Sequence, residues 1–332
     1  MTIGPLPARV GRPLAGRPVA APLVTAPIVT APVVTEPLVA ALDVGGTTIK
    51  AGLVGPDGSV HHSERHPTGV RRGPDAVIES ILGVARGLAR RAPVRGIGLG
   101  VPGIVDSAAG IARYAANLGW RDVPFARLLT ERLGLPAVLG HDVRNGALAE
   151  ARLGAGAGMP SVYFLAIGTG VAGGQVSGGV VDDGASGQAG EIGHLVVRPR
   201  GPRCNCGNRG CLEAIASASR IAAAYRRRAR TRGSAADVAR LVADGDPTAR
   251  AVWTEAIAAL ADALTAQIVL ADPGCIVIGG GLSLAGPTLF DPLRAALPQR
   301  LTFREPPPIR PAELGDRAGM VGAALRAWDM LL

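Results

Sequence analysis

The chain has 332 residues, 48% of them hydrophobic, and it carries a formal net charge of +9. This length can bury a sizeable core, and four cysteines are too few for a secreted scaffold held together by disulfides. Aromatic residues make up 3% of the chain, so the charge indicates a solvated arginine surface rather than a groove that stacks nucleic-acid bases. We therefore expect no nucleic-acid partner.

Residues 1–38 differ in composition from the rest of the chain. They lack the charged start and single apolar run of a signal peptide, and no apolar run in the chain reaches the roughly 18 residues of a membrane span. The segments "APLVT", "APIVT" and "APVVT" repeat every five residues from Ala21. Regular prolines block helix and sheet interiors, so we expect an extended, largely disordered arm without chemistry, on a cytoplasmic protein that contacts no membrane.

Regular structure is expected from about Pro37 onward. The apolar run "LVAALDVGG" predicts a buried strand, and "IKAGLVGPDGSVHHSE" predicts a hairpin with "PDG" as its turn. Helices and strands then alternate, which is typical of an α/β fold. The further elements are helix "PDAVIESILGVARGLARRA", strand "VRGIGLGVPGIVD", helix "VPFARLLTERLG", strand "PAVLGHD" and helix "VRNGALAEARLG".

The pattern restarts near residue 156. A strand "SVYFLAIGTG", an antiparallel strand "GGQVSGGVV", long helices at 214–230 and 247–271, a strand "GCIVIGGGLS" and a last helix "DRAGMVGAALRAWDM" follow. The two similar halves predict duplicated α/β domains around a cleft. We expect residues 39–155, joined by the C-terminal helix 316–332, to form one domain and residues 156–315 the other.

Glycine turns end three of the predicted strands. They lie in "DVGGTTIK", which runs from Asp43 to Lys50, at Gly168–Gly170 and at Gly279–Gly281. Glycine lets backbone N–H groups converge on an anion, although a tight turn needs glycine for steric reasons alone. Because ligands bind at the carboxyl ends of strands, three such turns favour a nucleotide lying across the cleft.

A histidine and three cysteines form a candidate metal site, with the spacing His194-x9-Cys204-x-Cys206-x4-Cys211. One imidazole and three thiolates complete a closed tetrahedral site of the kind that structural zinc prefers. A disulfide or a redox pair is the alternative, but redox cysteines usually have two residues between them. The remaining cysteine, Cys275, lies in an apolar strand and is expected in the core.

Asp142 stands at the end of a predicted strand, just before a helix. An aspartate at this place can cap the helix. It can also serve as the base that accepts a proton during phosphoryl transfer. The residues around Asp142 do not decide between these two roles.

Five ordered motifs resemble the ROK family of sugar kinases and repressors: "DVGGTTIK", "HDVRNGALAE", "IGTGVAGG", "GEIGH" and "CNCGNRGCLE". The resemblance runs from about Leu38 to the C-terminus. It implies the actin-like ATPase (ribonuclease H-like) fold that the family shares with hexokinases. It also implies that the cysteine loop binds zinc, and that Asp142 is the catalytic base for a sugar 6-hydroxyl.

The resemblance implies further roles for individual residues. Asp43 would hold Mg²⁺, and Lys50 is compatible with either a phosphate contact or a surface position. The residues implied in ATP binding are Asp43, Gly45, Gly46, Thr47, Lys50, Gly168, Thr169, Gly170, Gly279, Gly280 and Gly281. Those implied in sugar binding are Gly103, Asn117, His141, Asp142, Glu191, His194 and Glu213.

The chain departs from the family pattern beside the implied base. His141 replaces the usual asparagine, and "VRNG" replaces the common "ANAA". The expected function is an ATP-dependent hexose 6-kinase, glucose first, with N-acetylmannosamine or N-acetylglucosamine as the alternative substrate and polyphosphate as the alternative donor. A non-catalytic sugar sensor or a ROK repressor is the rival, but the arm has too many prolines for a helix-turn-helix. Family members are commonly dimers or tetramers, so we expect a homodimer or homotetramer.

Overall fold

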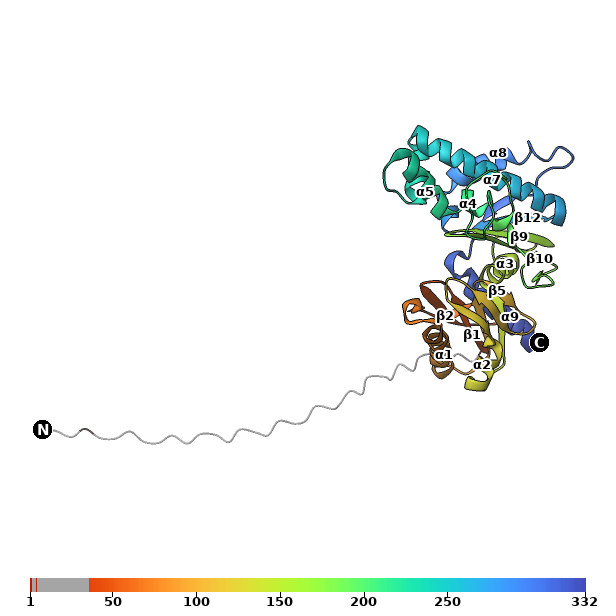
Figure 1. Cartoon of the computed structure of the whole chain (residues 1–332). Coiled ribbons are helices and arrows are strands. Elements are labelled where there is room, and N and C mark those ends of the chain that lie inside the picture. The colour runs from red at the N-terminus through yellow and green to blue at the C-terminus, as the bar shows by residue number, and fades with distance from the viewer. Residues whose placement is uncertain (2–3, 5–35) are drawn as a thin grey trace. The chain divides into compact units, whose positions relative to one another are not determined.

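The first large sheet collects strands from the N-terminal half of the chain (Figure 1). Its strand order is β3-β2-β1-β4-β8, in which β1, β4 and β8 are parallel and β2 and β3 form an antiparallel hairpin. The predicted "PDG" turn joins that hairpin. The strands are β1 (Leu38–Val44), β2 (Thr48–Val54), β3 (Val60–Pro67), β4 (Val94–Val101) and β8 (Ala137–His141).

Helices cover both faces of this sheet, which explains the continuous apolar run of β1. Leu38, Ala40 and Leu42 pack with helices α1 (Pro74–Arg91) and α2 (Phe125–Leu133). The intervening Val39 and Ala41 pack against helix α9 (Ala318–Leu331). Because neighbouring residues of a strand point to opposite faces, Leu38 to Leu42 are all apolar, and the polar Asp43 stands only near the carboxyl end of the strand.

The second large sheet has the order β11-β10-β9-β12-β13. As in the first sheet, a central strand pairs antiparallel on one side and parallel on the other, here β9 with β10 and β12. This repeat of the strand pattern confirms the predicted α/β class. The strands are β9 (Ser161–Ile167), β10 (Val171–Ser177), β11 (Val180–Val181), β12 (Cys275–Gly279) and β13 (Ile309–Pro311).

A layer of five helices covers one face of the second sheet, and helices α3 (Asp142–Leu153) and α9 cover the other. Tyr163, Leu165 and Ile167 of β9 face the helical layer. Val162 and Phe164 face α3 and the start of α9. The helical layer consists of α4 (Glu213–Ala216), α5 (Ala218–Ala229), α6 (Ala235–Ala243), α7 (Pro247–Ala271) and α8 (Pro287–Ala296).

Helices α3 and α9 therefore form the layer between the two sheets. Glycines allow the close packing of this layer. A side chain at Gly322 of α9 would overlap the carbonyl of Asn145 in α3, and one at Gly98 of β4 would overlap the carbonyl of Ala323. The helix that carries Asp142 is thus packed directly on the C-terminal helix.

Several elements differ from the sequence prediction. The helix expected at 214–230 is broken at Ser217, whose extended backbone and side-chain oxygen cap the start of α5. Helix α6 was missed, although Ser234 and Asp237 form a capping box that signals its start. Helix α8 was also missed. The strand expected at "VRGIGLGVPGIVD" is divided at Pro102 and Gly103 into β4 and a short strand, which joins two strands that were missed in a small antiparallel sheet. That sheet consists of β5 (Ile104–Asp106), β6 (Ile111–Ala115) and β7 (Trp120–Val123).

Helix α7 alone among the described helices is long and apolar enough to cross a membrane. It is nevertheless a core helix of the second half, because its buried residues pack under α4, α5, α6 and α8. Its apolar character follows from burial inside the protein.

The computed structural model describes residues 1, 4 and 36–332. The proline-spaced repeat lies outside the described residues, so the expected disorder of the arm stays a prediction. Residues 36–332 form one compact unit in which order begins at Leu38. The division into domains at residue 155 stays a proposal. The remaining short helices are η1 (Val70–Arg72), η2 (Ile192–His194), η3 (Gly281–Ala285) and η4 (Gly315–Arg317).

Candidate active site

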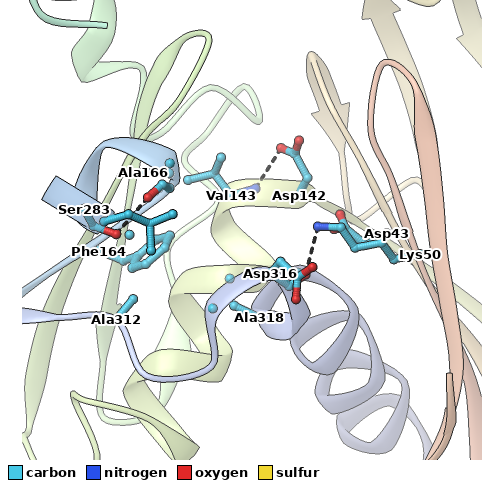
Figure 2. Close-up of a pocket in the computed structure, with 17 residues that line it drawn as sticks. Asp43, Lys50, Asp142, Val143, Phe164, Ala166, Ser283, Ala312, Asp316 and Ala318 are labelled. Carbon is cyan, nitrogen blue, oxygen red and sulfur yellow. Dashed lines mark hydrogen bonds and ion pairs between the residues drawn. The ribbon is translucent and has the colours of Figure 1, made fainter. Parts of the chain in front are cut away.

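A cavity of about 520 Å³ opens where the strand ends of both sheets meet the layer of α3 and α9 (Figure 2). It brings together six residues that the sequence analysis selected: Asp43, Lys50, Asp142, Gly279, Gly280 and Gly281. Its other lining residues are Val143, Gly146, Phe164, Ala166, Ser283, Leu284, Ala312, Gly315, Asp316, Ala318 and Gly319. The cavity therefore joins the predicted base to part of the predicted nucleotide site.

Asp142 is the first residue of α3, and the cap position belongs to His141. The N-cap interpretation of Asp142 is therefore wrong. The Asp142 Oδ1 accepts a hydrogen bond from the Val143 N–H at 2.7 Å, as Figure 2 shows. The side chain is 28% exposed. Burial raises the pKa of Asp142 to about 6, although the Val143 N–H opposes that rise.

Asp43 lies near the end of β1 and lines the same cavity, close to Asp142 (Figure 2). Burial, reinforced by the charge of Asp142, raises the pKa of Asp43 to about 7. Lys50 Nζ lies 3.5 Å from the Asp43 Oδ2 and donates to the Asp316 carbonyl at 2.8 Å (Figure 2). Lys50 is thus half-buried in the cavity wall, not on an open surface. A methyl group at Gly319 would lie 2.7 Å from the Asp43 carboxyl carbon, so this close packing requires glycine.

The two other glycine turns, Gly45–Thr47 and Gly168–Gly170, do not line this cavity. Gly46 and Thr47 are exposed, and a methyl group at Gly46 would lie 3.4 Å from the Asn117 Nδ2. Gly45 closes its turn by donating to the Thr48 carbonyl at 2.9 Å. The loop Gly168–Gly170 packs on the start of α5, and its Thr169 carbonyl accepts from the hydroxyl of that helix's first turn. Thr169 lines a separate hollow of about 240 Å³.

Several of the predicted sugar-binding residues lie near these loops. Glu213 Oε2 accepts from the Val171 N–H at 3.0 Å, directly after the loop Gly168–Gly170. Asn117 lies beside Gly46, as described above. Gly103 has φ of 93°, and a side chain there would overlap the Tyr114 carbonyl, so its turn requires glycine. Glu191 precedes η2, and its Oε2 lies 3.9 Å from the His194 Nε2.

His141 is buried beside the predicted base. Its Nδ1 lies 3.3 Å from the Asp142 Oδ1 and has no hydrogen-bond partner among the described residues. Burial lowers the pKa of His141 to about 4, and the nearby Arg144 charge acts in the same direction. The imidazole is therefore neutral at pH 7, with a nitrogen free to donate or accept near the cavity.

Sequence reasoning missed a charged network beside this histidine. Arg144 is completely buried, and its guanidinium binds the Asp183 carboxylate and the loop that precedes Glu191. Arg326 of α9 binds the same Asp183 carboxylate. Arg144 is the arginine of "VRNG", so the departure of this segment from the family pattern was the sequence signal that could have revealed the network.

The predicted metal ligands come together. One atom from each of His194, Cys204, Cys206 and Cys211 lies within 4.8 Å of the other three. The Cys206 and Cys211 sulfurs are 3.7 Å apart, as are the Cys204 Sγ and the His194 Nδ1. Zn–S bonds of about 2.3 Å place tetrahedral ligand atoms about 3.8 Å apart, so the donor set fits zinc. All four cysteines are free, and buried Cys275 lies in β12 as expected.

Comparison with known proteins gives the family. The model of the ROK family matches residues 39–329. The chain belongs to the ROK family. This match covers nearly all of the residues that the structure describes. The similar solved structures include a ROK family transcriptional regulator, with a TM-score of 0.79 and 25% identity over 88% of this chain and 78% of its own, so membership alone does not distinguish a kinase from a repressor.

Similar proteins include two kinases of different sugars and one solved complex. A glucokinase of Thermotoga maritima is 36% identical, over 85% of this chain and 95% of its own. An N-acetylmannosamine kinase of Escherichia fergusonii is 32% identical, over 86% and 97%. The structure of a ROK glucokinase from Streptomyces griseus in complex with glucose and AMPPNP has a TM-score of 0.77 and 29% identity, over 88% and 99%. The expected actin-like ATPase fold is confirmed.

Proposed function

We propose that this ROK protein is an ATP-dependent hexose kinase that phosphorylates the 6-hydroxyl, with glucose as its first substrate. The observation that carries the proposal is the cavity in which the Asp142 carboxylate faces Asp43 and the glycine turn of β12. A proton acceptor, a metal-binding carboxylate and an open backbone turn are the parts that phosphoryl transfer to an alcohol requires. The glucokinase similarity supports glucose as the acceptor.

Asp142 is the proposed general base. The Val143 N–H fixes its Oδ1, which leaves Oδ2 available to accept the proton of the sugar hydroxyl. The hydroxyl oxygen then forms its bond to the γ-phosphorus as the bond to the β-phosphate oxygen breaks, and ADP leaves. A pKa of about 6 keeps Asp142 ionised at neutral pH and still basic enough to accept the proton.

The nucleotide would lie along the β12 turn, with Asp43 and Lys50 at its phosphates. Asp43 fits the role of a Mg²⁺ carboxylate, because its raised pKa reports a buried charge that a bound cation would stabilise. Mg²⁺ would neutralise charge on the phosphates. The exposed loops Gly45–Thr47 and Gly168–Gly170 are the proposed phosphate contacts from the two sides. We place the protein in the cytoplasm, because glycolysis consumes ATP in that compartment and because its reducing conditions keep cysteine thiols free.

The sugar would bind between the two phosphate loops and the cysteine loop. We assign Gly103, Asn117, Glu191, His194 and Glu213 to its hydroxyls. His194 directs Nδ1 toward the cysteines, which leaves Nε2 toward Glu191 and the sugar. Zinc on His194, Cys204, Cys206 and Cys211 would order this loop without taking part in transfer, because four protein ligands leave no open position.

A coupled kinase assay with glucose, mannose, fructose, N-acetylglucosamine and N-acetylmannosamine tests the proposal. ATP and polyphosphate are compared as donors, and analytical ultracentrifugation tests the expected homodimer or homotetramer. Glucose with ATP should give the highest kcat/KM. A preference for N-acetylmannosamine would favour the second sugar class, which the similarity to the Escherichia fergusonii enzyme supports. Binding of a hexose without any turnover would contradict the kinase and favour the sensor.

A further inference from the structure

Arg144 occupies an unusual environment for a charged side chain. It lies in α3, two residues after Asp142, and its side chain is completely buried. A guanidinium keeps its charge inside a protein, so such burial is costly unless the donors are bound. All three nitrogens of Arg144 donate a hydrogen bond.

These donors converge on one loop. The Arg144 Nε donates to the Asp183 Oδ1 at 2.7 Å. The two Nη atoms donate to the carbonyls of Ala189 and Gly187, each at 3.0 Å. The loop of residues 182–190 follows β11 and ends at Glu191, a proposed sugar ligand. A single buried side chain of α3 thus binds the loop at both its start and its end.

The loop is also fixed from its other sides. Arg326 binds both oxygens of Asp183, at 2.9 and 2.8 Å. Gly190 accepts from the Gly173 N–H of β10 at 2.7 Å. A side chain at Gly187 would overlap the Val105 carbonyl of β5. Gly190, which directly precedes Glu191, is therefore held by β10, and Ala189 is held by Arg144.

We propose that Arg144 is a positioning residue, which fixes Glu191 and His194 relative to Asp142 so that the bound hexose presents its hydroxyl to the base. This inference rests on the proposed function. It assigns a role to a residue that contacts neither the cavity nor the metal ligands. Its physical basis is that α3 carries both the base and the arginine, so one rigid element sets both sides of the sugar site.

The test compares Arg144→Gln and Arg144→Lys with the matched control Arg152→Gln, all in the full chain. Arg152 lies in the same helix and also binds one turn carbonyl, that of Gly179, and one carboxylate, that of Asp329. Its partners lie in the turn between β10 and β11 and in α9, outside the loop of residues 182–190. The readouts are the Kd for glucose by calorimetry, the KM for glucose and for ATP, kcat, zinc content and melting temperature.

We expect Arg144→Gln to raise the Kd and KM for glucose at least about tenfold, while the KM for ATP stays within about twofold and zinc is retained. Arg144→Lys keeps the charge near Asp183 but cannot bind both carbonyls, so its glucose affinity should be intermediate. Full rescue by lysine, or an effect no larger than that of Arg152→Gln, would overturn the inference. Failure of both Arg144 variants to fold would overturn it too, since the contact would then serve the fold.

The same measurements separate this inference from the kinase proposal. If the unmodified chain binds glucose but does not phosphorylate it, the kinase proposal fails, and the comparison of Kd values still decides the role of Arg144. If the chain phosphorylates glucose and the variants bind it normally, only the inference fails. A chain that binds none of the five sugars would contradict both.

Discussion

The carboxyl groups of Asp43 and Asp142 both line the cavity, together with Lys50. Burial raises the pKa of each, to about 7 and about 6. Such paired shifts are a feature of catalytic sites, because a buried carboxylate is held at a cost in stability for the sake of its chemistry. A substitution that removes either carboxylate should therefore change both the activity and the free energy of unfolding.

Asp142→Asn keeps the shape of the side chain and removes the base. We expect kcat to fall at least about a hundredfold, because general-base assistance commonly contributes about 10² to 10⁴. The Kd for glucose should change little, since the proposed hydroxyl ligands remain. A coupled assay and calorimetry on the same variant measure both. Asp291→Asn, which removes an exposed carboxylate of α8, is the control. Near wild-type turnover in Asp142→Asn would contradict the base.

The same substitution should stabilise the protein at pH 8. The folded state binds the Asp142 proton more tightly than the unfolded chain, so the carboxylate destabilises the fold above about pH 6 and has no effect below about pH 4. The pKa difference between 3.8 and about 6 corresponds to at most about 3 kcal/mol of unfolding free energy. Urea unfolding at pH 8 and pH 4 should show this gain only at the higher pH.

At the scale of elements, helix α3 and the cysteine loop set the sugar side of the site. His194 ends η2, and the three cysteine ligands lie in the loop between η2 and α4. The Asn208 N–H holds the pKa of the Cys206 thiol below its usual range. A thiolate is the form that binds a metal. Burial and the neighbouring thiols raise the pKa of the Cys211 thiol to about 12, so this thiol would lose its proton only on binding a metal.

Protein purified without added metal should contain about one zinc per chain by elemental analysis, because four ligands make one tetrahedral site. Cys206→Ser should lose the zinc, lower the melting temperature by about 5 °C or more and weaken glucose binding, since metal binding and loop folding are linked. Cys275→Ala changes the cysteine of β12 and should keep the metal. Zinc-free protein with normal glucose affinity would contradict the assignment.

At the scale of the whole molecule, the described fold begins at Leu38, where β1 pairs with β2 and β4. The proline-spaced repeat precedes that strand. Deleting residues 1–35 should leave kcat, KM and melting temperature nearly unchanged, because the repeat cannot join a helix or a sheet interior. Kinetics and calorimetry on the truncated chain check this. DNA binding that disappears with the deletion would instead favour the repressor.

The sequence by itself determined the features that are local in the chain. The metal ligands lie in one loop, the glycine turns end apolar strands, and Asp142 directly follows a buried strand, so spacing alone predicts each of them. The elements it missed, such as α6, β6 and β7, are short, and their apolar residues are buried by distant segments. The family resemblance supplied the functional roles of these residues. The sequence showed that His141 and Arg144 depart from the family pattern, but it did not show what these two side chains contact.

Only the tertiary structure decided what surrounds Asp142. The partners of Arg144 lie 39 to 45 residues away, and Arg326 is 143 residues from the carboxylate that it shares with Arg144. No spacing rule connects such positions, because α9 returns from the end of the chain to pack between the sheets. The raised pKa values of Asp43 and Asp142 have the same origin. They depend on burial by both halves of the fold, which exists only once α3 and α9 are packed together.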